Sequence, residues 1–111
     1  MTTIDTDTAE LLHVLGYLYT HHGQAQRGLV LLLIAARIAP DHAGIMRTLA
    51  HALTVNGYGE RALVVIEQLA VIEPDPPPSL LLLKSRALWI TGDRIAARRC
   101  FREYVERREA A

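Results

Sequence analysis

The chain has 111 residues, of which 50% are hydrophobic, and its 12 basic and 12 acidic residues leave no net charge. This length suits a single domain, and the balanced charge argues against a protein that binds nucleic acid by general electrostatic attraction. The polar N-terminus lacks a signal-peptide pattern, the apolar run at 29–36 is too short to span a bilayer, and the single Cys100 has no disulfide partner, so we expect a cytoplasmic protein without membrane insertion.

A repeat of 34 or 35 residues organises almost the whole chain. Gly23, Gly57 and Gly92 are each followed five residues later by a glycine or alanine, and Pro40 and Pro74 keep the same step. This period is typical of tetratricopeptide units, each a pair of antiparallel helices, and such arrays bind other polypeptides. The sequence therefore predicts an all-α, tetratricopeptide-like array of three antiparallel helix pairs. The units are expected at 9–42, 43–77 and 78–111, after a lead-in at 1–8.

The repeat also indicates where each helix lies. In chain order, we expect helices at about 7–22, 25–39, 42–56, 59–73, 78–91 and 94–108. Asp7, Asp41 and Asp93 precede the first, third and sixth of these or begin them, and they are the expected N-caps. The run from Pro74 to Pro78 should end the fourth helix and form a stiff connection, because proline cannot continue a helix interior.

Small residues recur where the two helices of each unit should touch. In the first helices these are Gly16, Ala50 and Ser85, and in the second helices they are Gly28, Ala62 and Ala97. A larger side chain at either place would push the helices apart.

Two further stretches leave alternatives open. The apolar run at 29–36 is either a buried helix inside the array or a helix partly covered by a partner, and both can hold together. The last helix is rich in arginine, which can indicate nucleic acid. However, Glu103, Glu106 and Glu109 interleave with the arginines and no aromatic platform accompanies them, so a solvated face or an acidic protein partner is favoured.

The concave face, formed by the first helix of each unit, is the expected binding surface. Its predicted partner-binding residues are His13, Tyr17, Thr20, His21, Arg47, His51, Thr54, Val55, Leu82, Arg86, Trp89 and Ile90. Aromatic and aliphatic side chains with a few hydrogen-bond donors suit an amphipathic helix or an extended apolar segment.

The same residues do not predict chemistry. His13, Tyr17 and His21 share one helical face, but the spacing of the two histidines and the lack of converging donors argue against a metal site. The chain also has no glycine-rich phosphate loop, no Ser-His-Asp candidate and no isolated pair of carboxylates. We expect a protein that is not an enzyme and that needs no cofactor.

Taken together, the chain resembles the SctY (YscY) family, small tetratricopeptide chaperones of bacterial type III secretion. The resemblance spans nearly the full length. It is carried by Leu15-Gly16-Tyr17-Leu18, Gly23 with Arg27, Gly59-Glu60-Arg61-Ala62, Ser85-Arg86-Ala87-Leu88, Gly92-Asp93, and Ala97-Arg98 with Tyr104.

The resemblance implies a cytosolic chaperone in a virulence-associated protein-transport machinery. Such a chaperone would hold a small secreted partner, SctX, in a heterodimer and dock with it onto the cytosolic domain of the export-gate protein SctV. A needle-subunit co-chaperone of the same machinery remains an alternative. So does a generic tetratricopeptide scaffold or regulatory module.

Overall fold

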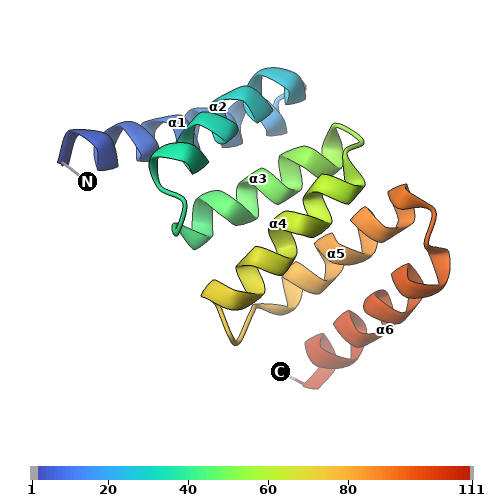
Figure 1. The fold of residues 1–111 in the computed structure, drawn as a ribbon. Helices are drawn as coiled ribbons and strands as arrows, with labels where there is room; N and C mark the ends of the chain where they lie inside the picture. Colours follow the sequence, from blue (N-terminus) through green and yellow to red (C-terminus); the bar gives the residue numbers. More distant parts are fainter. Residues whose placement is uncertain (1–2, 111) are drawn as a thin grey trace.

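The structure is a computed structural model that describes residues 3–110, and this part of the chain is entirely helical (Figure 1). The helices are α1 (Thr3–His21), α2 (Ala25–Ile38), α3 (Ala43–Val55), α4 (Gly59–Ile72), α5 (Pro78–Thr91) and α6 (Arg94–Ala110). They pack as consecutive pairs, α1 with α2, α3 with α4 and α5 with α6, and the pairs stack along the array. The predicted tetratricopeptide-like array of helix pairs is confirmed.

Most helix boundaries fall within two residues of the prediction, but the start of α1 does not. α1 begins at Thr3, four residues before the predicted start, so residues 3–8 of the expected lead-in are helical, while residues 1, 2 and 111 lie outside the described part. Asp7 is consequently inside a helix and is no N-cap. His42 caps α3 in place of Asp41, because its Nδ1 accepts a hydrogen bond from the Ile45 amide at 3.1 Å. Asp93 is confirmed as a cap, since its Oδ1 accepts from the Ala96 amide at 3.2 Å.

The turn inside each pair uses the same backbone device. Gly23, Gly57 and Gly92 have φ angles of 81°, 86° and 92°, in the left-handed region that only glycine enters without strain. Each of these glycines therefore lies just after a helix, and the small residue five positions later is in the first turns of the next helix, where the two helices first touch.

That contact is closest in the first pair. A Cβ added to Gly28 would lie 2.7 Å from the Gly16 carbonyl oxygen and 2.9 Å from the Thr20 amide nitrogen, both backbone atoms. In the second and third pairs, the alanines at the equivalent place, Ala62 and Ala97, are buried. The predicted small-residue contact is confirmed, and it needs glycine in the first pair but admits alanine in the other two.

The core runs along the array. Leu32 of α2 and Leu53 of α3 belong to one buried cluster, and Leu69 of α4 belongs to another with Leu80 of α5. Within the apolar run at 29–36, one face is buried, as expected for a helix inside the array, and the other face is exposed. Across residues 3–110, no helix combines the length and the apolar character needed to cross a bilayer.

Candidate protein-binding groove

A groove with a volume of about 530 Å³ opens along the first helices of the three pairs, α1, α3 and α5. Its lining consists of Tyr17, His21, Arg47, Thr48, His51, Ser79, Leu80, Leu82, Leu83 and Arg86. The leucines of α5 supply apolar surface, and the side chains of α1 and α3 supply aromatic rings and hydrogen-bond donors. The groove is long, shallow and mixed in chemistry.

Half of the predicted partner-binding residues meet in this groove. They are Tyr17, His21, Arg47, His51, Leu82 and Arg86. They come together because positions four apart on a helix share a face, and because the first helices of successive units stand side by side.

Thr20 and Thr54 are not available to a partner, and their prediction as groove residues is wrong. Their exposed fractions are only 7% and 6%. The Thr20 hydroxyl donates to the Gly16 carbonyl at 2.7 Å, and the Thr54 hydroxyl donates to the Ala50 carbonyl at 2.8 Å. Thr20 also lies against Gly28 of the neighbouring helix, so this register position belongs to the contact inside the pair.

The remaining predicted residues lie outside this groove. His13 faces the next helix, where its Nε2 is 2.7 Å from the Thr48 hydroxyl. Val55 and Trp89 are exposed near the C-terminal ends of α3 and α5, and the Trp89 ring carries the Arg94 guanidinium 4.8 Å above its centroid. Ile90 lies beside Gly59 at the start of α4, on a different depression.

The groove also contains residues that the sequence did not single out. Ser79 has the place in the third unit that Glu10 has in the first, so the repeat register alone points to it. Thr48 and Leu83 directly follow the predicted residues Arg47 and Leu82, and Leu80 precedes Leu82 by two residues. They face the preceding pair and reach the groove because the stacked helices leave a gap between them.

Aromatic rings link α1 to α3 at the centre of the groove. The rings of His21 and His51 stack with centroids 5.0 Å apart and planes 14° apart, and the Tyr17 ring lies 4.2 Å from that of His21. Burial lowers the pKa of His51 below its ordinary value, and the nearby His21 and Arg86 lower it further. The neutral form of His51 is therefore favoured, which suits stacking against a second imidazole.

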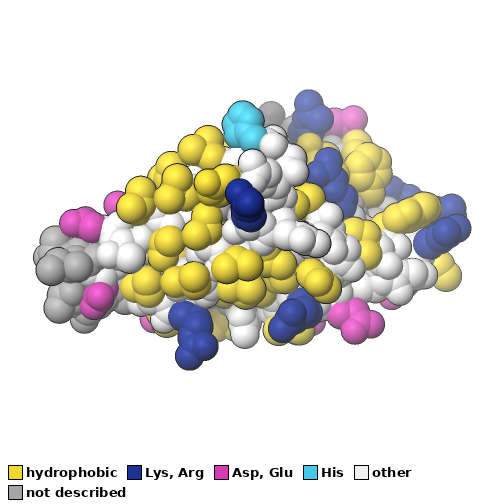
Figure 2. Space-filling view, turned by 90° about the horizontal axis from the view of Figure 1, so that it is seen from above, with side chains coloured by type: hydrophobic (Ala, Val, Ile, Leu, Met, Phe, Trp, Pro, Cys, Tyr) yellow, Lys and Arg dark blue, Asp and Glu magenta, His cyan; other side chains and the backbone are white. Residues whose placement is uncertain are grey.

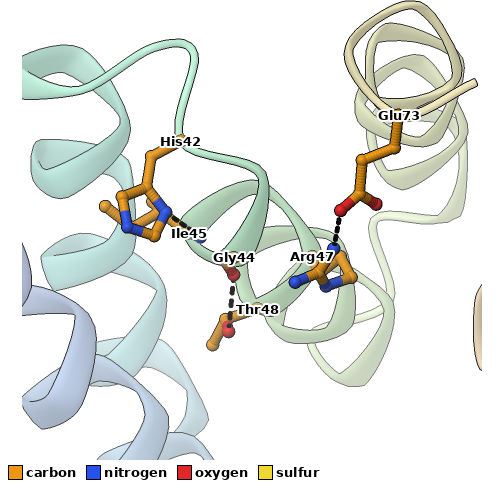
Figure 3. A network of polar contacts seen from close by, with 6 residues as sticks. All are labelled: His42, Gly44, Ile45, Arg47, Thr48 and Glu73. Carbon is orange, nitrogen blue, oxygen red and sulfur yellow. Dashed lines mark hydrogen bonds and ion pairs between the residues drawn. The ribbon is translucent and has the colours of Figure 1, made fainter. Parts of the chain in front are cut away.

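The two groove arginines are in different electrostatic situations. Arg47 of α3 forms an ion pair with Glu73 at the end of α4, and the other oxygen of Glu73 is buried without a hydrogen-bond partner (Figure 3). Among the described residues, Arg86 of α5 has no ion-pair partner. Arg86 is thus the cation in the groove whose charge is left for a ligand.

A second cleft of about 550 Å³ continues the groove between α1 and α3. It shares Tyr17, Arg47 and Thr48 with the groove and extends to His13, Val14, Leu18 and Gly44. Burial is the main cause that lowers the pKa of His13, with His42 and Arg47 adding to it and Glu10 opposing it.

Between residues 3 and 110, no three His, Cys, Asp or Glu side chains gather in a way that could hold a metal ion. Comparison with known protein families and with characterised proteins gave no match for the sequence. The candidate functional site is therefore this open groove, which has apolar walls, two stacked imidazole rings and one arginine, Arg86, without an ion-pair partner among the described residues.

Proposed function

We propose that this chain is a protein-binding chaperone whose groove between α1, α3 and α5 holds an amphipathic segment of a small partner. The observation that carries the proposal is the convergence of Tyr17, His51, Leu82 and Arg86 from three helices on one open groove. Grooves of this kind bind helices through apolar anchors spaced along one face.

The apolar part of the groove sets the first requirement on the partner. Leu82 is half-buried, and the Tyr17 ring is exposed beside the histidine stack. Removing such surfaces from water on binding is the main favourable term, and central aromatic side chains usually carry much of it. The partner segment should therefore present two or three large apolar side chains.

The charges of the groove set the second requirement. Arg47 is already paired with Glu73, whereas Arg86 is exposed and lies near the imidazole of His51, whose pKa it lowers. A carboxylate of the partner placed at Arg86 would gain a charge-assisted hydrogen bond. An amphipathic helix with an acidic residue beside its apolar face meets both requirements.

The resemblance to the SctY family supports a finer form of the proposal. In that form the chain works in type III secretion, holds a small secreted SctX-like protein as a one-to-one complex, and presents it to the cytosolic domain of SctV. The work is the shielding of an aggregation-prone segment, without nucleotide and without covalent chemistry.

The test is coexpression with a small SctX-like secreted protein, followed by calorimetric titration of the purified pair. Tyr17→Ala and Leu82→Ala should each weaken binding by about thirtyfold, as expected for central interface residues. Arg86→Ala should weaken it by about tenfold, through the lost carboxylate contact.

Trp89→Ala is the matched control, because Trp89 is also a large exposed side chain of α5 but lies outside the groove. It should leave the affinity unchanged. If groove variants that keep their helical circular dichroism bind normally, or if Trp89→Ala alone abolishes binding, the groove is not the binding site.

A further inference from the structure

The outer face of α1 has the composition of a buried face. In the repeat register, Leu11, Val14 and Leu18 of α1 correspond to Ile45, Thr48 and Ala52 of α3 and to Leu80, Leu83 and Ala87 of α5. In α3 and α5 these positions face the preceding helix pair, and most of them are fully buried. No pair precedes α1 within the described chain, so Leu11, Val14 and Leu18 are 60%, 55% and 43% exposed.

The outer face of α2 extends this apolar surface. Leu33 and Ile34 are exposed, whereas the corresponding residues are Glu67 and Gln68 in α4 and Arg102 and Glu103 in α6. Figure 2 shows apolar side chains gathered on this end of the molecule, with basic side chains among them and along one edge and acidic side chains at another edge. We call the surface formed by Leu11, Val14 and Leu18 of α1 the N-terminal face.

The opposite end of the array does not match this face. Arg94 and Arg98 of α6 occupy the places of Gly59 and Leu63 in α4, which pack towards the next pair. Stacking one molecule head-to-tail on another would set these arginines against exposed leucines. Apolar surface would then meet charge, which removes the gain from burial and makes an open filament unfavourable.

The N-terminal face does match itself when turned by a two-fold axis. Asp7, Leu11, Val14 and Leu18 of α1, with His22 directly after its end, follow one another at steps of four, three, four and four residues, the spacing of a helix–helix seam. In an antiparallel pair of α1 helices with the axis near Val14, each Leu11 meets the Leu18 of the other copy, and each Asp7 meets its His22. Such a closed two-fold contact uses the same patch twice.

We propose that the N-terminal face docks a second copy of this chain through antiparallel packing of the two α1 helices. The polar ends of the seam support this occupant, because the carboxylate of Asp7 at one end meets the imidazole of His22, a potential hydrogen-bond donor, at the other. None of the residues that line the groove belongs to the N-terminal face, so each copy keeps the groove open, whereas Val14 and Leu18 also line the cleft that continues it and the dimer would cover that part of the cleft. A complex with a partner would then contain two of each chain.

Sedimentation equilibrium of the full chain tests the proposal. The wild-type protein should be a dimer, and the double variant Leu11→Glu/Leu18→Glu should lower the dimer affinity by roughly a hundredfold or more, since each dimer would bury four charges. Both side chains are exposed in the single chain, so the variant should keep its helical circular dichroism. The matched control is Val71→Glu, an exposed apolar position on α4, which should stay dimeric.

A charge exchange tests the direction of packing. Asp7→Arg alone should weaken the dimer, and Asp7→Arg combined with His22→Asp should restore it, because the two ends of the seam exchange signs. A wild-type chain that stays monomeric at all concentrations, with or without a bound partner, overturns the proposal. So does a dimer that survives Leu11→Glu/Leu18→Glu or dissociates on Tyr17→Ala.

Discussion

The two ends of this array share one backbone plan but differ in surface chemistry. At the first pair, Leu11 is exposed at a place where Ile45 and Leu80 are buried in the other two pairs, and Ile34 is exposed where those pairs carry polar residues. At the last pair, Arg94 and Arg98 replace the glycine and leucine that α4 uses to contact the next helix. The outer side of α6 thus carries charged residues, as terminal repeats of solenoids do, whereas the outer side of α1 is apolar.

The difference continues inside the pairs. Gly16 and Gly28 bring the backbones of α1 and α2 together, whereas Ser85 and Ala97 separate α5 and α6 by at least one methyl group. The polar links between pairs are also concentrated in the first two units, as His13 to Thr48 and His21 to His51 show. The first pair is thus tightly built and apolar outside, and the last pair is looser and charged.

The largest expected effect comes from the contact inside the first pair. Gly28→Ala should lower the free energy of unfolding by about 3 kcal/mol, because the new methyl group would meet backbone atoms that cannot move aside. Ala97→Gly, at the same place in the last pair, should cost only about 1 kcal/mol, mainly from helix propensity. Urea denaturation measures both, and equal costs would remove the proposed difference in packing between the pairs.

A smaller effect is expected from opening the closed end. Arg98→Leu places a leucine where the other pairs have Leu29 and Leu63, so the C-terminal end should gain an exposed apolar surface that favours self-association. Self-association at this end should strengthen by about tenfold, which light scattering would detect as species heavier than those of the wild type. Arg108→Leu, an exposed change later on α6, is the control and should leave the mass unchanged.

A third prediction concerns the ion pair between α3 and α4. Glu73→Gln should destabilise the fold by about 1 kcal/mol, because Arg47 loses its partner while both side chains remain partly exposed to solvent. Arg61→Gln changes an exposed charge on the same α4 and should have no measurable effect. Thermal unfolding distinguishes the two, and equal shifts in midpoint would mean that the pair contributes nothing specific.

The smallest effect is a dependence on pH that should be confined to the first two pairs. His13 and His51 have lowered pKa values in the fold, so the unfolded chain binds protons at a higher pH than the folded chain does. Stability that is complete above the ordinary histidine pKa should therefore decline as the pH falls below about 6.5. The loss should appear as lower amide protection factors in α1 and α3, after correction for the slower intrinsic exchange at low pH.

Two outcomes bear on this pH prediction. His51→Gln should reduce the acid-induced loss, while the amide protection factors of α6, which contains no histidine, should not change between about pH 7.5 and about pH 5.5. Uniform destabilisation of all helices would assign the pH effect to general charge repulsion and not to these two imidazoles.

The recurrence of small residues and glycines predicted the array well. The five-residue step from Gly23 to Gly28 joins a left-handed turn to a close helix contact, and both features are backbone constraints that few residue types satisfy. The start of α1 was missed because Asp7 has the character of an N-cap, although the helix continues back to Thr3. A residue type that favours the N-cap position does not by itself fix where a helix begins.

The groove was predicted less completely, for a different reason. The repeat register placed Tyr17, His51 and Arg86 together, because one helical face repeats along the array. It also placed Thr20 there, but the small contact residues draw α2 so close that Thr20 is buried against Gly28. A side chain on the border between two faces is exposed or buried according to how closely the neighbouring helix packs. The residue spacing does not predict that interhelical distance.

The sequence by itself determined that the chain forms three helix pairs and which face of each helix is apolar, because both follow from local periodicity and turn chemistry. Only the tertiary structure decided which apolar faces are covered. Leu11 and Leu80 have the same place in the repeat, yet Leu80 is buried by the preceding pair and Leu11 has no described neighbour there. Burial is a property of what packs alongside a residue, so identical positions in a repeat acquire different roles at the end of the array and inside it.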